Sequence, residues 1–107
     1  MPTKKANIGD QEAKYGGMHR LREALGSEAV GLTVVDCPPG WEGPEHDHAD
    51  KNHEEIYLLL DGHAEVTIEG ETVALEPGDG VLVDPAETRQ VHNGDTDSRL
   101  IFAGANR

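Results

Sequence analysis

Five side chains that can ligate a metal ion lie within ten residues of one another near the middle of the chain: His46, His48, His53, Glu54 and Glu55. In an extended segment, residues two apart face the same way, so His46 and His48 share a face. Two imidazoles and one carboxylate form a ligand set for Zn²⁺, or for non-haem Fe(II) with open coordination positions. The stretch therefore indicates a metal site, although a polar loop on an acidic protein can carry the same residues without binding a metal.

Alternation along the following segment indicates which carboxylate joins the two histidines. In a strand that begins near residue 53, His53, Glu55 and Tyr57 share one face and Glu54 falls on the other. We therefore expect Glu55 to be the third ligand and Glu54 to point outward. His53 shares the face of Glu55 and is a substitute ligand. Tyr57 is expected in the core or at the rim of the site, where it could line a cavity.

The elements that must position these side chains follow from hydrophobic periodicity. Met18, Leu21 and Leu25 are three and four residues apart, which predicts one short N-terminal helix with Gly26 as its stop. Alternating and apolar runs predict seven strands, over residues 30–37, 54–60, 63–68, 72–75, 81–83, 89–93 and 100–103.

Turn residues separate these strands and indicate the fold class. Asp61-Gly62 predicts a hairpin, and further turns are expected at Glu69-Gly70, Pro77-Gly78-Asp79 and Asn93-Gly94-Asp95. Many short strands with almost no helix predict an all-β domain, either a β-barrel or a double-sheet jelly roll.

Length and charge bound the domain organisation and the partners. The chain of 107 residues predicts a single domain, with residues 1–14 as a polar arm or edge strand and residues 15–107 as the barrel. Hydrophobic residues make up 36% of the chain, which argues against disorder. The formal net charge of −12 argues against nucleic acid or an anionic membrane as a partner. A high-salt cytoplasm is one setting that would favour such an acidic surface, as a halophilic adaptation.

The remaining sequence features favour a cytoplasmic protein. No apolar stretch is long enough for a membrane span, and the N-terminal residues lack the apolar core of a signal peptide. The sole cysteine, Cys37, cannot form an internal disulfide. We expect it to be a small buried apolar residue and not a nucleophile.

One motif in the chain resembles the first motif of the cupins, which are small β-barrels of the jelly-roll type. That motif reads glycine, five residues, His-x-His, three or four residues, glutamate, six residues, glycine. The chain matches it with Gly40, His46, His48, Glu55 and Gly62, and the gap from His48 to Glu55 is longer by two or three residues. The resemblance implies a divalent metal ion (Zn, Fe, Mn or Ni) bound by the two histidines and Glu55.

A second cupin motif is present in degraded form. It reads glycine, five residues, proline, one residue, glycine, two residues, histidine, three residues, asparagine. Gly78 and Asn93 occupy its two ends, whereas Asp84 and Ala86 replace the internal proline and glycine. Arg89 stands where the histidine is expected.

Arg89 is the informative departure, because an arginine cannot ligate a metal and is always charged. At about 4 Å it would be repelled by a dication by about 8 kcal/mol at an effective dielectric constant of roughly 20. Three arrangements are open. Arg89 pairs with Glu55 in a metal-free barrel, or it stands back and clamps an anionic ligand. In the third, a bulge or register shift turns Gln90 or His92 inward, although strand alternation makes a surface position more natural for His92.

Two classes of function remain. The first is a single-domain cupin that binds a divalent metal, a small anionic ligand or both, with no assigned activity. The second is a metal-dependent enzyme (a dioxygenase, isomerase or lyase) that acts on a small organic acid, although no residue stands out as its general base. The resemblance also implies a homodimer, which the polar arm could support by exchanging between subunits.

Overall fold

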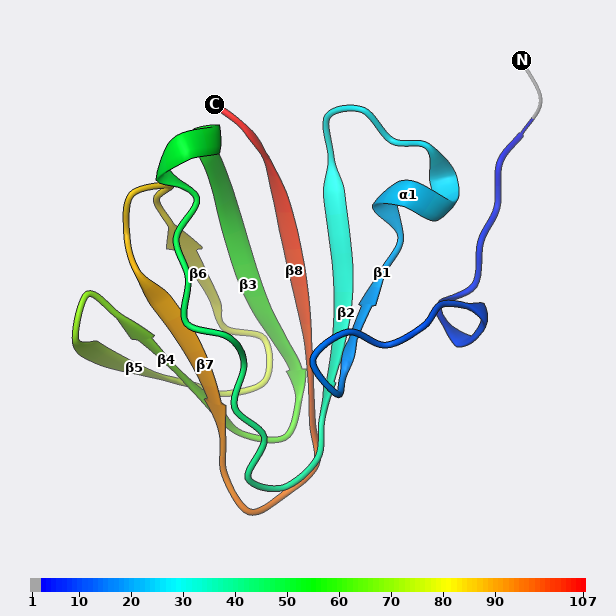
Figure 1. Ribbon diagram of the computed structural model, residues 1–107. Coiled ribbons are helices and arrows are strands. Elements are labelled where there is room, and N and C mark those ends of the chain that lie inside the picture. The colour runs from blue at the N-terminus through cyan, green and yellow to red at the C-terminus, as the bar shows by residue number, and fades with distance from the viewer. Residues whose placement is uncertain (1–2) are drawn as a thin grey trace.

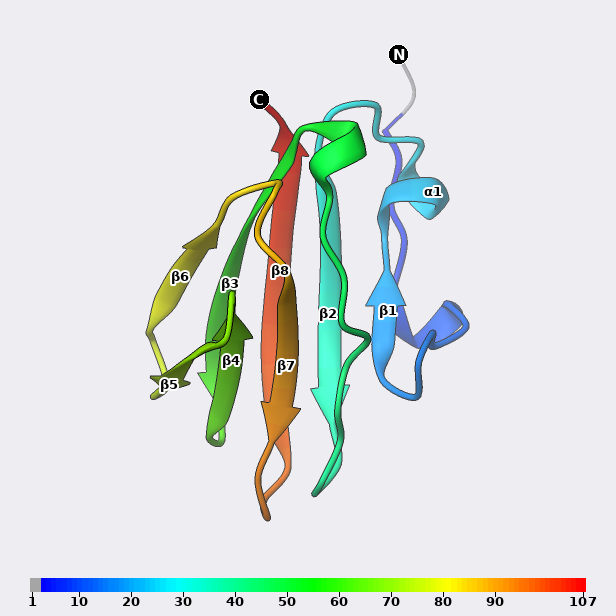
Figure 2. The ribbon, with the colours of Figure 1, turned by 60° about the vertical axis from the view of Figure 1, so that its left-hand side comes forward.

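The computed structural model describes residues 3–107 and contains two antiparallel β-sheets that face each other (Figures 1 and 2). The larger sheet has the strand order β1-β2-β8-β3-β6, and the smaller has the order β5-β4-β7. This arrangement confirms the predicted all-β, double-sheet class. The elements in chain order are η1 (Ile8–Asp10), β1 (Met18–Arg20), α1 (Arg22–Leu25), β2 (Gly31–Cys37), η2 (Ala49–Lys51), β3 (His53–Asp61), β4 (Ala64–Ile68), β5 (Glu71–Leu75), β6 (Gly80–Val83), β7 (Arg89–Asn93) and β8 (Ser98–Asn106).

Strand alternation builds the core between the two sheets. Along β3, Tyr57 and Leu59 are fully buried, whereas Ile56, which precedes Tyr57 and faces the other way, is 51% exposed. Glu55 lies on the same inward face as Tyr57, and Glu54 lies on the outward face, as predicted. Burial of each large apolar side chain contributes about 1.5–3 kcal/mol. Strand β3, which carries Glu55, is therefore fixed in place by the packing of Tyr57 and Leu59 in the core.

Cys37 is part of this core, as expected from the sequence. Its side chain is buried at the end of β2. Burial raises the pKa of the Cys37 thiol from an ordinary value of 9.0 to about 12, and because the thiolate is the reactive form, the group is inert at neutral pH.

The prediction of a hairpin at Asp61-Gly62 is wrong. Strand β3 pairs with β6 and β8, whereas β4 pairs with β5 and β7, so the turn carries the chain from one sheet to the other. Gly62 has φ +87° and packs so closely on Ser98 of β8 that a Cβ atom would collide with it. The short dipeptide signal cannot distinguish this packed corner from a hairpin. Glu69-Gly70, by contrast, does form a two-residue hairpin between β4 and β5.

The helix predicted from the spacing of Met18, Leu21 and Leu25 is shorter than expected. Met18 belongs to the edge strand β1 and is paired with Val35 of β2, and α1 contains only Arg22–Leu25. Met18 is 6% exposed, so packing onto the sheet overrides the local helical spacing. Gly26 ends the helix in the left-handed conformation, φ +67°, as predicted.

The described part of the N-terminal arm, residues 3–14, contains η1 and no strand. Residues 1–2 of the predicted arm lie outside the described residues. No helix within residues 3–107 has both the length and the apolar character needed to cross a membrane.

The loop that carries the histidines runs antiparallel to β7 and acts as an additional strand of the smaller sheet. The N–H of Gly43 donates to the carbonyl of Val91 at 2.9 Å. His46 and Arg89 exchange two backbone hydrogen bonds, at 3.0 and 2.8 Å. These bonds satisfy the loop backbone and fix His46 directly beside Arg89.

Asn93, which matches the second cupin motif, has a structural role. Its side-chain amide donates to the carbonyls of Pro38 and Thr96, both at 2.8 Å, and its oxygen accepts from Ser98 Oγ at 2.7 Å. Asn93 is 8% exposed, and a buried amide that is satisfied in this way fixes the surrounding turns. The network joins the segment after β2 to the turn between β7 and β8. Both lie at the end of the barrel opposite η2 (Figure 1).

Candidate metal centre

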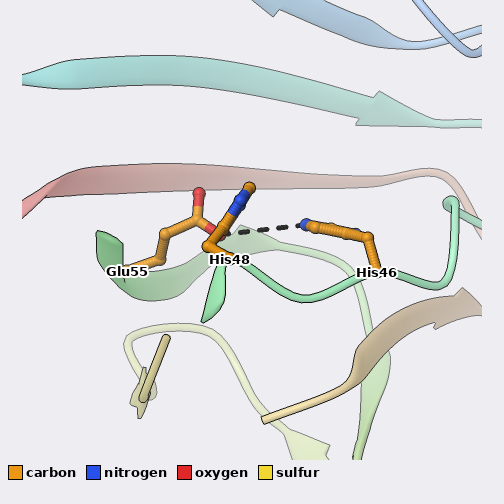
Figure 3. Close-up of side chains that lie close together, drawn as sticks. All are labelled: His46, His48 and Glu55. Atoms are coloured by element: carbon orange, nitrogen blue, oxygen red, sulfur yellow. Dashed lines mark ion pairs between the residues drawn. The ribbon is translucent and has the colours of Figure 1, made fainter. Parts of the chain in front are cut away.

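Three predicted ligands converge at the η2 end of the barrel (Figure 3). One ligand atom from each of His46, His48 and Glu55 lies within 4.8 Å of the other two. Glu55 Oε1 is 3.1 Å from His48 Nε2 and 4.0 Å from His46 Nε2. The three side chains come from two elements, the loop along β7 and the start of β3.

Local structure explains why the longer gap between His48 and Glu55 does not separate them. The extra residues form the short helix η2, and Asn52 then reverses the chain into β3 in the left-handed conformation, φ +49°. Asparagine tolerates this conformation better than most residues because its side chain bonds locally. The backbone N–H of His48 also donates to the carbonyl of Pro85 at 2.8 Å, which anchors the loop to the opposite wall.

The donor set fits a divalent metal ion. His46 Nδ1 lies 2.9 Å from the carbonyl oxygen of Pro44, which can only accept, so Nδ1 carries the proton and Nε2 presents its lone pair. Two ligand atoms about 2.1 Å from one tetrahedral ion are about 3.4 Å apart. The separations of 3.1 and 4.0 Å from Glu55 Oε1 lie on either side of that value. The two histidines and Glu55 would therefore hold such an ion and leave at least one coordination position open.

The electrostatic surroundings keep His48 in the neutral form that ligates metals. Burial lowers the pKa of His48, and the nearby charges of His46, Arg89 and His53 act in the same direction. Glu55 alone among the named neighbours raises that pKa, through its negative charge. The net shift is downward, so the imidazole is poised to bind a cation without first losing a proton.

Tyr57 supports Glu55 from below and does not line the cavity. Its hydroxyl donates to Glu55 Oε1 at 3.3 Å, and its ring stacks on Phe102 with centroids 3.8 Å apart. Burial raises the pKa of Tyr57, and the carboxylate of Glu55 raises it further. The hydroxyl therefore stays protonated and acts as a hydrogen-bond donor that orients Glu55.

Arg89 points inward from β7, but it does not form the predicted pair with Glu55. Its side chain is 1% exposed, and its Nη2 donates to the carbonyl of Asp84 at 2.7 Å. Within residues 3–107, no carboxylate lies at ion-pair distance from its guanidinium, and Nε and Nη1 have no hydrogen-bond partner. Glu55 faces the two histidines instead, and its Oε1 accepts a hydrogen bond from the Tyr57 hydroxyl.

The other predicted residues occupy three different positions. His53 lines the cavity beside His48, with ring centroids 5.3 Å apart, and its Nδ1 contacts Asn106 at 3.3 Å. Gln90 and His92 lie on the outward face of β7, which keeps a regular register with β4. Gln90 donates to the carbonyl of Gly43, and His92 pairs with Glu42 at 3.5 Å. The register shift that would turn either residue inward is therefore absent from β7.

A cavity of about 500 Å³ opens beside the three ligands. Several of its lining residues were not predicted. Some come from β1, α1, β2 and β8, which sequence patterns did not place near the histidines, and others lie in the histidine loop itself. Three of the lining residues are cationic, which is a third of the nine lysines and arginines in the whole chain. The unpredicted lining residues that bear on ligand chemistry are Arg20, Arg22, Thr33, Asp47, Asp50, Lys51 and Phe102.

Comparison with solved structures shows the same fold in many proteins. A cupin protein from Bacteroides fragilis is 25% identical, with a TM-score of 0.80 over 96% of this chain and 83% of its own. KdgF from a Halomonas species is 22% identical, with a TM-score of 0.75 over 100% of this chain and 96% of its own. A predicted oxalate decarboxylase from Thermotoga maritima is 24% identical, with a TM-score of 0.75 over 94% of this chain and 97% of its own.

No curated protein matches the chain. The cupin domain model, however, matches residues 33–104, which are most of the chain and contain all three predicted ligands. The two facing sheets and the similar solved structures agree with this match. The chain belongs to the cupin family.

Proposed function

We propose that this cupin binds a divalent metal ion through His46, His48 and Glu55 and a small molecule in the adjoining cavity. The observation that carries the proposal is the convergence of three donor atoms within 4.8 Å at the wall of a cavity of about 500 Å³. Zn, Fe, Mn and Ni all accept imidazole and carboxylate ligands. Because all three residues line this cavity, an ion held by them would lie beside the space where a small molecule would sit.

The charges around the cavity support a small anionic ligand. Arg20, Arg22 and Lys51 line it, although Asp47 and Asp50 lie there too. In a chain with net charge −12, three cations at one cavity are a local departure from the acidic surface. Cations near a cavity raise the local concentration of anions. Arg22 already donates to the carbonyls of Ser27 and Glu28, so Arg20 and Lys51 are the freer of the three.

A second candidate function is metal-dependent catalysis on such an anion. A bound metal ion would polarise a carbonyl or carboxylate oxygen of the substrate. The structural neighbours described as a sugar phosphate isomerase and as a predicted oxalate decarboxylase have names that refer to small organic anions. In this chain, His53 lines the cavity with its ring centroid 5.3 Å from that of His48, which makes it the residue to test for proton transfer.

We also propose that the chain forms a homodimer through the outer face of the larger sheet. Register places apolar side chains side by side across four strands of that face, and Ile56 of β3 and Leu82 of the edge strand β6 are 51% and 54% exposed. A contiguous apolar face of this kind is typical of an interface. We call it the outer apolar face, and it consists of Leu32, Val34, Ile56, Leu58, Leu82, Ile101 and Ala103.

Elemental analysis tests the metal site. The untagged protein, purified without chelator, should contain close to one equivalent of Mn, Fe, Ni or Zn, and His48→Ala should lose it. His92→Ala is the matched control, because His92 lies on the outward face of β7 and pairs with Glu42. Metal retained in His48→Ala, or absent from the wild type after reloading, would refute the site.

A further inference from the structure

Arg89 is a buried cation whose charge has no partner within residues 3–107. The side chain is 1% exposed, and its single hydrogen bond, from Nη2, goes to the neutral carbonyl of Asp84. Nε and Nη1 are buried without any acceptor. Arg89 faces inward from β7, and its backbone exchanges two hydrogen bonds with that of the proposed ligand His46.

A buried, unpaired guanidinium is unfavourable by several kcal/mol, and arginine cannot relieve this by losing its proton. Native proteins rarely leave such a group without a partner, so the unpaired charge of Arg89 points to a counter-charge that residues 3–107 do not supply. Glu55 cannot be that acceptor in a metal-bound protein. Its carboxylate then faces the ion, and one carboxylate does not offset both a dication and Arg89.

We propose that the metal ion and a small carboxylate anion bind to this site as a pair, and that Arg89 makes the binding of one depend on the other. The inference rests on the proposed metal site and adds the class of ligand and its linkage to the metal. The anion binds in the cavity that the three ligands line and offsets the combined positive charge of the ion and Arg89. Without the anion, repulsion by Arg89 weakens the binding of the metal.

Linkage requires the effect to be reciprocal: an anion that tightens metal binding must itself be bound more tightly by the metal-loaded protein. Coupling between two ligands is commonly about 5–150-fold in affinity. We expect formate to tighten Ni²⁺ binding by the metal-free wild type about tenfold or more. We also expect Ni²⁺ to tighten formate binding by the same factor.

The experiment measures the Kd of Ni²⁺ by calorimetry in a non-coordinating buffer, with and without formate. Arg89→Gln removes the charge and keeps a polar side chain of similar length, and circular dichroism checks that the variant folds. Its Ni²⁺ affinity without formate should exceed that of the wild type, and its formate dependence should disappear. Arg89→Lys keeps the charge and should keep a formate dependence. Arg99→Gln, which changes an exposed arginine that pairs with Asp36 and does not line the cavity, should leave the dependence as in the wild type.

Equal Ni²⁺ affinity with and without formate in the wild type would overturn the linkage while leaving the metal site intact. An undiminished formate dependence in Arg89→Gln would overturn the role of Arg89. Failure of the wild type and every Arg89 variant to bind Ni²⁺ under any condition would overturn the metal site itself, and with it this inference.

Discussion

The Tyr57 hydroxyl lies 3.3 Å from Glu55 Oε1, the same oxygen that faces both histidine Nε2 atoms. Tyr57 is fully buried and stacked on Phe102, so its hydroxyl has a fixed position. The carboxylate of Glu55 is thereby held at one rotamer before a metal ion arrives. A rigid second residue behind a metal ligand generally strengthens binding by reducing the freedom that the ligand loses.

Tyr57→Phe should therefore weaken metal binding without unfolding the protein. It removes the hydrogen bond to Glu55 and leaves the stacking on Phe102 in place. Loss of such a supporting contact typically reduces metal affinity about 10–100-fold. The measurement is the Kd of Zn²⁺ by competition with a chromophoric chelator, with thermal unfolding as the check on folding. An unchanged Kd would show that Glu55 needs no support from Tyr57.

The inert state of Cys37 leads to a prediction on pH. Because burial raises the pKa of the thiol from 9.0 to about 12, the folded protein retains the proton where the unfolded chain has lost it. The contribution to stability is present below pH 9 and is lost as the pH rises through about 12. At pH 8, iodoacetamide should label Cys37 in denaturant but not in the folded protein. Rapid labelling of the folded protein would show that the thiol is accessible.

The packed corner at Gly62 gives a third prediction. Gly62 and Gly70 both have positive φ, +87° and +79°, but a Cβ atom at Gly70 would meet nothing within 4 Å, whereas one at Gly62 would collide with Asp97 and Ser98. Gly70→Ala should lower the free energy of unfolding by about 1–2 kcal/mol from backbone strain alone. Gly62→Ala should lower it further, because overpacking adds about 1–3 kcal/mol. Urea denaturation of both variants measures the difference, and equal losses would contradict the collision.

Much of the fold and of the candidate site could be predicted because the signals were local. Alternation along residues 53–60 placed Glu55 inward and Glu54 outward, and the spacing of His46 and His48 placed both imidazoles on one side. The histidine loop was longer than the motif allows, but the added residues formed η2 and left the ligands together. Local geometry was sufficient wherever neighbouring residues determine the direction of a side chain.

The failures arose where long-range packing decides the structure. Asp61-Gly62 reads as a hairpin, yet Gly62 packs on Asp97 and Ser98 near the start of β8, and the backbone of His63, the next residue, bonds to Ser98 35 residues away. Met18 has helical spacing, yet it joins the edge of a sheet, where it pairs with Val35, 17 residues further along the chain. The sequence could not predict that Arg89 lacks a partner either. That outcome depends on Glu55, which contacts His48 instead of Arg89 in the folded chain.

The outer apolar face gives the last prediction. Ile56 of β3 lies between Ala103 of β8 and Leu82 of β6, and Leu32 of β2 continues the same row. This row carries no charged side chain, so two copies of a protein with net charge −12 can meet there with less repulsion than elsewhere. A specific interface requires about 800 Å² from each partner, which fits a sheet face of four strands.

Ile56→Lys should convert the dimer into a monomer, because a charge buried at the centre of an apolar interface is strongly unfavourable. Its side chain is half-exposed in the single chain, so folding should be retained. Thr72→Lys is the control, since Thr72 is exposed on β5 of the other sheet and adds the same charge. Size-exclusion chromatography with light scattering should give a dimer for the wild type and for Thr72→Lys, and a monomer for Ile56→Lys. A dimer that survives Ile56→Lys must use another surface, such as the arm at residues 3–14, because lysine at this position cannot be accommodated in the apolar row.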